Sequence, residues 1–325
     1  MDKPLSISVK NLSRKFGKLW AIKNISFDIH QGEIVGFLGP NGAGKSTTMR
    51  ILGGLQNAHT GSAHVCGLSV AENSLGIKRK IGFMQENNPL PEELRVSEYL
   101  KLRAELKEIP PAEISTEVRR VMDLCDLFRT ARRKIIRTLS KGFKQRVGIA
   151  DALIGKPDII ILDEPTIGLD PHQIQGIRTL IDSLRGTHTV LISSHILSEI
   201  EKSCDRVIII NNGLVVAMGT KAELIENFIP KKQLSVTLKG QSDELLNAWK
   251  TAELPLELNH TIEKEDDTLE LIFNLTDKQY DMSSILEASR QLNHCQISGI
   301  SCIHPDLESI FLAATKRSWD EVRSK

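Results

Sequence analysis

A glycine-rich loop between an apolar segment and a helical pattern constrains this chain more than any other feature. Ile34–Leu38 is a short apolar run, typical of a buried strand. Met49, Ile51 and Leu52 have the spacing of one face of a helix. The segment between them consists of Gly39, Pro40, Asn41, Gly42, Ala43, Gly44, Lys45, Ser46 and Thr47. It contains the Gly-x4-Gly-Lys-Ser pattern of phosphate-binding loops.

Each residue type in this loop has a physical task. Glycines let backbone N–H groups turn toward a phosphate without a Cβ in the way. The helix that follows offers its N-terminus, which carries about +0.5 charge. Lys45 is predicted to reach the β- and γ-phosphates, and Ser46 to bind Mg²⁺. The alternative is a chance glycine-rich turn, which the flanking strand and helix disfavour. The loop alone therefore predicts binding of a nucleoside triphosphate.

Two further apolar strands end in side chains suited to hydrolysis. Ile159–Leu162 leads directly into Asp163 and Glu164. Asp163 is placed to hold Mg²⁺ through water, and Glu164 to polarise an attacking water. Thr189–Ile192 leads to His195, which can hydrogen-bond the γ-phosphate or the water. The alternatives are an acidic pair at a turn and an ordinary polar residue after a strand.

Two other segments indicate a function only in combination with these elements. Gln85 is a candidate to touch Mg²⁺ and water, although in isolation it would more often be an ordinary polar residue. The segment Gly168-Leu169-Asp170-Pro171 would otherwise be a plain turn.

The order of the predicted elements indicates an α/β fold with a largely parallel sheet. Strands are expected over 7–16 and 22–29, and mostly helix over 97–128 with a break at the Pro110-Pro111 pair. A further helix is expected after Ser140. Residues 207–216 are predicted to form a hairpin, because Asn212-Gly213 suits a type I′ turn.

The hydrophobic pattern changes after about Lys221. From there, alternating apolar residues and short helical patterns continue to the end of the chain. Residues 231–325 are predicted to form a small α/β domain, with helices near 242–252, 281–293 and 305–316. The first domain would then cover 1–230, and the boundary would lie near Pro230-Lys231-Lys232.

Charge and cysteine content exclude several classes of protein. Lys and Arg number 42 against 41 Asp and Glu, so the net charge is +1 and no nucleic-acid partner is expected. The five cysteines are scattered and form no CxxC, which argues against a disulfide scaffold or a zinc site. No apolar stretch approaches the ~18 residues of a membrane span. If the protein acts at a membrane, we expect another chain to cross it.

Taken in order, these motifs resemble those of the ATP-binding cassette ATPases. The matching elements are 39–47, Gln85, Leu139-Ser140-Lys141-Gly142, Asp163-Glu164, Gly168-Leu169-Asp170 and His195. The resemblance covers about residues 5–220. It implies a phosphate-loop core in which a mostly parallel sheet carries an N-terminal antiparallel β subdomain and a helical signature subdomain. It also implies ATP hydrolysis with ATP and Mg²⁺ as ligands.

The resemblance further implies a head-to-tail dimer, with each ATP between the phosphate loop of one subunit and the signature of the other. Ser140 and Gly142 would contact that ATP, and Asp170 would lie at the dimer contact. Lys141 and Phe143 occupy positions where the family commonly has Gly and Gln. These departures put in doubt the affinity of the signature for the ATP of the other subunit, or the geometry of the dimer. Phe16 resembles the aromatic residue that stacks on adenine; core packing is the alternative, and Trp20 is a competing candidate.

Three features resemble the ATPase subunits of ABC-2-type exporters, in the gliding-motility and multidrug-type branch. These are Lys141, the segment Gln85-Glu86-Asn87-Asn88-Pro89 and the tail 306–312, for which a plain amphipathic helix is the alternative. This resemblance implies separate ABC-2-type permease subunits that contact the region from Asn87 to Leu100. It also implies a homodimer or pairing with a related ATPase, and a cytoplasmic location on the inner face of the membrane.

Two alternatives remain open at this point. A soluble regulatory cassette ATPase is the other functional class, which the single phosphate loop and the lack of a heptad run disfavour. The basic segment from Arg129 to Arg146 is either a solvated face or a positive field near the opposing triphosphate, with anionic lipid or RNA contact as a weaker option.

Overall fold

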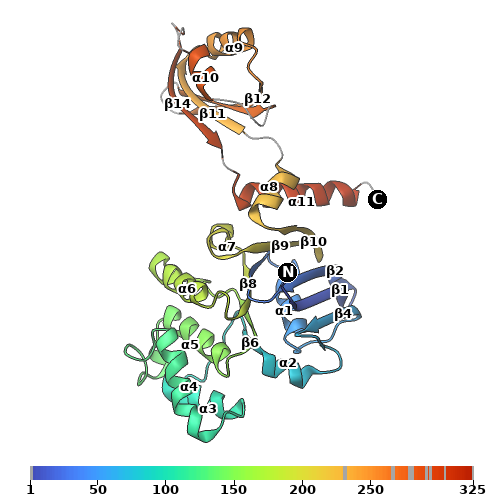
Figure 1. Cartoon of the computed structure of the whole chain (residues 1–325), viewed down its shortest axis with the longest axis vertical. Helices are drawn as coiled ribbons and strands as arrows, with labels where there is room; N and C mark the ends of the chain where they lie inside the picture. The colour runs from blue at the N-terminus through green and yellow to red at the C-terminus, as the bar shows by residue number, and fades with distance from the viewer. Residues whose placement is uncertain are drawn as a thin grey trace. The chain divides into compact units, whose positions relative to one another are not determined.

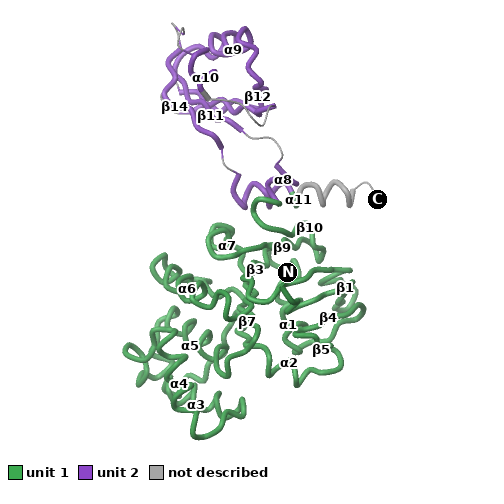
Figure 2. The backbone as a smooth tube through the Cα atoms, in the orientation of Figure 1, with its two compact units in different colours: residues 1–223, 314–325 green, residues 224–313 purple. Residues whose placement is uncertain are grey.

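A computed structural model describes residues 3–229, 233–264, 268–276, 282–289, 292, 295–303 and 305–323. The chain divides into two compact units (Figure 2). Unit 1 is 1–223 with 314–325, and unit 2 is 224–313. The division therefore differs from the predicted 1–230 and 231–325 at both ends of the second unit. The predicted boundary itself, at 230–232, lies outside the described residues.

A six-stranded sheet forms the centre of unit 1 (Figure 1). Its strand order is β10 (Leu214–Gly219), β9 (Arg206–Asn211), β3 (Ile34–Leu38), β8 (Thr189–Ser194), β7 (Ile159–Asp163) and β6 (Ile81–Met84). All neighbours are parallel except β9 and β10. Every residue of β3, β7 and β8 is buried, as expected of parallel strands covered on both faces. The predicted α/β fold with a largely parallel sheet is confirmed.

A four-stranded antiparallel sheet lies at the N-terminal side of unit 1. Its order is β2 (Leu19–His30), β1 (Leu5–Phe16), β4 (Thr60–Val65) and β5 (Leu68–Ser69). Helix α1 (Lys45–Leu52) shares one hydrophobic core with this sheet and with β3. That core contains Met49 of α1, Phe27 of β2 and Phe37 of β3. The ring centroids of Phe27 and Phe37 are 5.7 Å apart. The helix that follows the loop is therefore fixed by burial of its apolar face.

Helices α3 (Val96–Leu106), α4 (Pro111–Leu124) and α5 (Lys141–Leu153) form a helical region within unit 1 (Figure 1). The chain breaks between α3 and α4 at the proline pair, as predicted. The Tyr99 hydroxyl donates to Asp151 Oδ2 at 2.8 Å, and Arg103 Nε donates to Asp151 Oδ1 at 2.7 Å. These bonds join α3 to α5, the helix that begins at the signature segment.

The remaining elements of unit 1 connect these layers. They are α2 (Ser74–Lys80), the 3-10 helix η1 (Ile136–Thr138), α6 (Pro171–Ser183) and α7 (Leu197–Ser203). Asn212 and Gly213, between β9 and β10, both have positive φ angles, 48° and 77°, as a type I′ turn requires. None of the helices among the described residues combines the length and the apolar content that a bilayer crossing requires.

Unit 2 contains a second antiparallel sheet covered by helices on one face. Its elements are β11 (Gln233–Gly240), α9 (Ser242–Thr251), β12 (Leu256–Lys264), β13 (Thr268–Leu275), α10 (Met282–Ala288) and β14 (Cys295–Ile303). The sheet order β12-β13-β11-β14 is that of a split βαβ fold. The indole of Trp249 packs on Phe273 with ring centroids 4.9 Å apart. The helices α8 (Lys221–Phe228) and α11 (Leu307–Arg323) each contain residues of both units.

Candidate active site

The loop from Gly39 to Thr47 has the backbone that its glycines predict. Gly42 and Gly44 have φ angles of 79° and 110°, which strongly favour glycine. A Cβ on Gly39 would lie 2.3 Å from the carbonyl oxygen of Ile210, so no side chain fits there. The Gly213 N–H donates to the Ala43 carbonyl at 3.0 Å. The β9–β10 turn therefore holds the loop in place from the side.

A polar cavity of about 340 Å³ opens beside this loop. Five residues from other parts of the sequence complete its wall: Ala21, Glu86, Glu164, Ile167 and His195. The loop itself contributes Pro40, Asn41, Gly42, Gly44, Lys45, Ser46 and Thr47. The carboxyl ends of β3, β7 and β8 thus meet at one place, where open α/β sheets bind their ligands.

Three charged or titratable side chains face one another in the cavity. Lys45 Nζ lies 3.6 Å from Glu164 Oε1, and both side chains are buried. His195 Nδ1 lies 2.7 Å from Glu164 Oε2, so an N–H on this nitrogen donates to the carboxylate. Lys45 Nζ also donates to the Gly39 carbonyl at 2.7 Å. Glu164 therefore has a cation on one side and an imidazole on the other.

Adjacent strand ends fix the two acidic residues. In the β7–β8 register Asp163 lies opposite Ser193, whose hydroxyl donates to Asp163 Oδ1 at 2.6 Å. The Glu164 N–H in turn donates to Ser193 Oγ at 2.9 Å. Glu164 has a φ of 52°, an uncommon angle for a residue with a side chain and one often found at functional sites. Ser193 was not among the predicted site residues, although a polar residue ending an apolar strand was a visible signal.

The oxygen-bearing side chains here suit a hard divalent cation. Ser46 lines the cavity at the start of α1, and the Asp163 carboxylate is buried at the neighbouring strand end. Hydroxyl and carboxylate oxygens are the ligands that Mg²⁺ prefers. Asp163 and Ser46 therefore fit the metal that the sequence predicts.

The structure does not bring Gln85 into this arrangement. Gln85 is exposed at the end of β6, and its neighbour Glu86 lines the cavity instead. Two hydrogen bonds of Asn88 hold the turn that follows Gln85. Asn88 Nδ2 donates to the Lys144 carbonyl at 2.8 Å, and the Asn88 N–H donates to the Gln85 carbonyl at 3.0 Å. This turn leaves the Gln85 side chain facing solvent.

The signature residues lie outside the cavity of their own chain. Ser140 is exposed at the start of α5, and its hydroxyl makes no capping hydrogen bond. Gly142 is buried; a Cβ there would lie 2.6 Å from Gln173 Oε1. Asp170 caps α6 by accepting from the Gln173 N–H at 2.9 Å. Lys141 reaches over Gly168, where an added Cβ would lie 2.3 Å from its Nζ.

Both candidate adenine-stacking residues are exposed on the β1–β2 hairpin. Phe16 is 49% exposed and Trp20 is 42% exposed, so neither packs in the core. The Arg14 guanidinium lies 5.0 Å from the Phe16 ring centroid, and Lys15 Nζ lies 5.4 Å from that of Trp20. Neither ring lines the phosphate cavity.

The loop, its buried lysine and the carboxylate at the end of β7 define the protein as an ATPase of the phosphate-loop class. The ABC transporter family matches residues 22–167. The linearmycin resistance ATP-binding protein LnrL of Bacillus subtilis is 31% identical over 96% of this chain and 99% of its own length. The daunorubicin/doxorubicin resistance ATP-binding protein DrrA of Streptomyces peucetius is 30% identical over 97% and 94%.

A solved cassette structure is similar as well. The dimeric post-hydrolysis state of the ATP-binding cassette MJ0796, bound to ADP and Pi, superposes with a TM-score of 0.61 at 28% identity. The match covers 66% of this chain and 98% of that one. The chain belongs to the ABC transporter family, as an ATP-binding subunit that hydrolyses ATP.

Proposed function

We propose that this ATPase lies on the inner face of the membrane and energises export through separate, membrane-spanning ABC-2-type permease subunits. The observation that carries the proposal is the match over nearly the whole length of LnrL and DrrA, both named as drug-resistance ATP-binding proteins. Both alignments extend past the cassette and so include the second unit. The alternative, a soluble regulatory ATPase, has no comparable support.

Five side chains in and beside the cavity have a task in the proposed hydrolysis. Lys45 binds the terminal phosphates, with the loop N–H groups beside it. Glu164 accepts a proton from the attacking water, and His195 holds that carboxylate through its Nδ1, 2.7 Å away. Ser46 and Asp163 would hold Mg²⁺, which supplies charge neutralisation at the phosphates when bound.

The proposed working form is a dimer that ATP holds together. Ser140 and Gly142 lie outside the cavity of their own chain, so we assign them to the ATP bound by a second subunit. The start of α5 offers helix N–H groups to a γ-phosphate. The MJ0796 cassette is dimeric, which supports this arrangement. The second subunit is either another copy of this chain or a related ATPase.

Ser140→Ala should weaken ATP-driven dimerisation about tenfold or more, because a hydrogen bond to a charged phosphate is lost. ATP binding to the monomer should not change, since Ser140 lies outside that cavity. Sedimentation with ATP, in a Glu164→Gln background that prevents hydrolysis, measures the effect. Thr138→Ala, which removes another exposed hydroxyl nearby, is the matched control. A normal dimer of Ser140→Ala would exclude the assignment.

Affinity purification of the tagged chain from membranes tests the transport proposal. We expect a permease chain with several membrane spans to co-purify, and to alter the ATPase rate when the two are reconstituted in vesicles. Replacing exposed residues between Asn87 and Leu100 should reduce this recovery, because that segment is the proposed permease contact. Recovery of the chain without any membrane protein would favour the regulatory alternative.

A further inference from the structure

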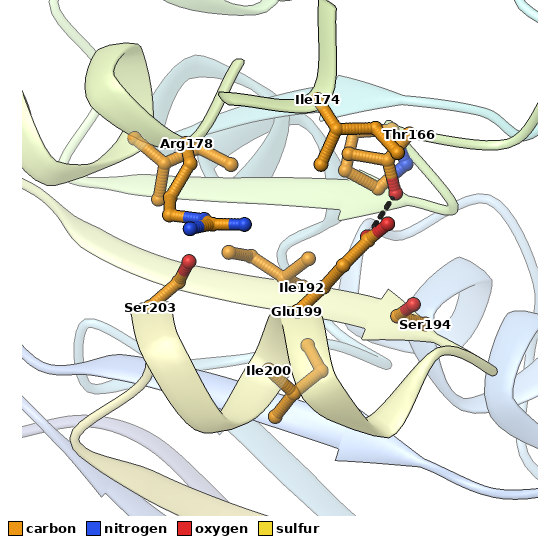
Figure 3. A pocket seen from close by; sticks show the side chains of 10 residues that line it. Thr166, Ile174, Arg178, Ile192, Ser194, Glu199, Ile200 and Ser203 are labelled. Atoms are coloured by element: carbon orange, nitrogen blue, oxygen red, sulfur yellow. Dashed lines mark hydrogen bonds between the residues drawn. The ribbon is translucent and has the colours of Figure 1, made fainter. Parts of the chain in front are cut away.

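A second hydrogen bond links the two segments that carry Glu164 and His195. Thr166 follows Glu164 by two residues, and Glu199 follows His195 by four. The Thr166 hydroxyl donates to Glu199 Oε2 at 2.5 Å (Figure 3). This bond and the bond between His195 and Glu164 therefore join the segments 164–166 and 195–199 at both of their ends.

The second hydrogen bond is relevant to catalysis because Glu164 and His195 both lie just past the ends of their strands. Glu164 lies past the end of β7 with its uncommon φ of 52°, and His195 lies past the end of β8. Helix α7 begins two residues after His195, is seven residues long, and has no side-chain cap. The Thr166–Glu199 bond therefore adds a second side-chain link between the segments, besides the bond of His195 to Glu164.

The surroundings of Glu199 give the bond a buried setting. Thr166 is 7% exposed, and a small pocket beside it is lined by Ile174, Ile192 and Ile200 (Figure 3). Arg178 of α6 lines the same pocket. Among the described residues, Arg178 Nε and Glu199 Oε1 have no hydrogen-bond partner. The pocket volume of about 20 Å³ is enough for one water.

We propose that Glu199 is a positioning residue for ATP hydrolysis. Through its hydrogen bond with Thr166, it holds Glu164 and His195 in position relative to each other. It touches neither the phosphate cavity nor the loop from Gly39 to Thr47. The proposal rests on the assignment of Glu164 as the residue that activates water. Its effect should therefore fall on the chemical step and leave ATP binding unchanged.

Thr166→Val and Glu199→Ala should each lower kcat about tenfold, since small displacements of catalytic groups are costly. The KM for ATP and the calorimetric Kd should stay within about twofold. The double variant should be no slower than either single variant, because both remove the same bond. Thr166→Ser keeps the hydroxyl and should restore most of the rate. Ser203→Ala, which alters the same pocket without touching the bond, is the control.

The outcomes separate this proposal from others. Unchanged kcat in both single variants would overturn it. Loss of ATP affinity and of melting temperature in parallel with kcat would show a merely structural role, and would also overturn it. Hydrolysis that survives in Glu164→Gln would instead remove the role of Glu164, whatever the Thr166 and Glu199 variants do.

Discussion

Glu164→Gln is expected to lower kcat for ATP hydrolysis by about 100- to 10,000-fold, the range typical of removing a general base. The amide keeps the shape of the side chain but cannot take a proton from water. In the wild-type chain the Glu164 carboxylate lies 3.6 Å from Lys45 Nζ and 2.7 Å from His195 Nδ1. Phosphate release under saturating ATP measures the effect.

ATP binding should survive in this variant, and the ATP-bound dimer should accumulate because the γ-phosphate is not cleaved. Size-exclusion chromatography with ATP would then show a dimer that the wild-type chain forms only transiently. Glu108→Gln is the matched control, since Glu108 pairs with Arg79 on the open surface, where such pairs contribute little. Phosphate release at the wild-type rate would rule out the proposed role of Glu164.

The second large effect is expected from Lys45→Ala, which should weaken ATP binding about 10- to 100-fold. A hydrogen bond to a charged group contributes about 1.5–3 kcal/mol, and Lys45 is the buried cation of the loop. Isothermal calorimetry with ATP measures the change. Unchanged affinity would contradict the assignment of the phosphate loop.

Lys45→Ala also leaves Glu164 without the ammonium group beside it, so stability must be followed separately. Lys45→Met keeps most of the side-chain volume and removes only the charge. A similar loss of affinity in both variants, with melting temperatures near that of the wild type, would assign the effect to the missing charge. Lys80→Ala removes an exposed lysine paired with Asp158 and is the control.

Local sequence patterns predicted many of the elements. The buried strands β3 and β7, the helix break at Pro110-Pro111 and the turn at Asn212-Gly213 all follow from interactions within a few residues. Strands β6 and β12 were not predicted, because Ile81–Met84 is short and β12 is largely exposed with a mixed composition. The division at Leu224 differs from the predicted boundary near Pro230, because it falls inside helix α8 (Lys221–Phe228) and not in a loop.

In the active site, too, some features follow from the local sequence and others only from the tertiary structure. The order Gly-x4-Gly-Lys-Ser determined the phosphate loop on its own, because its backbone angles depend on the residues within it. The tie from Thr166 to Glu199 and the place of Ser193 came only from tertiary structure. They arise because strands β7 and β8 are parallel and in register, which brings together residues about 30 positions apart. Such a register depends on burial across the whole sheet, and no short segment encodes it.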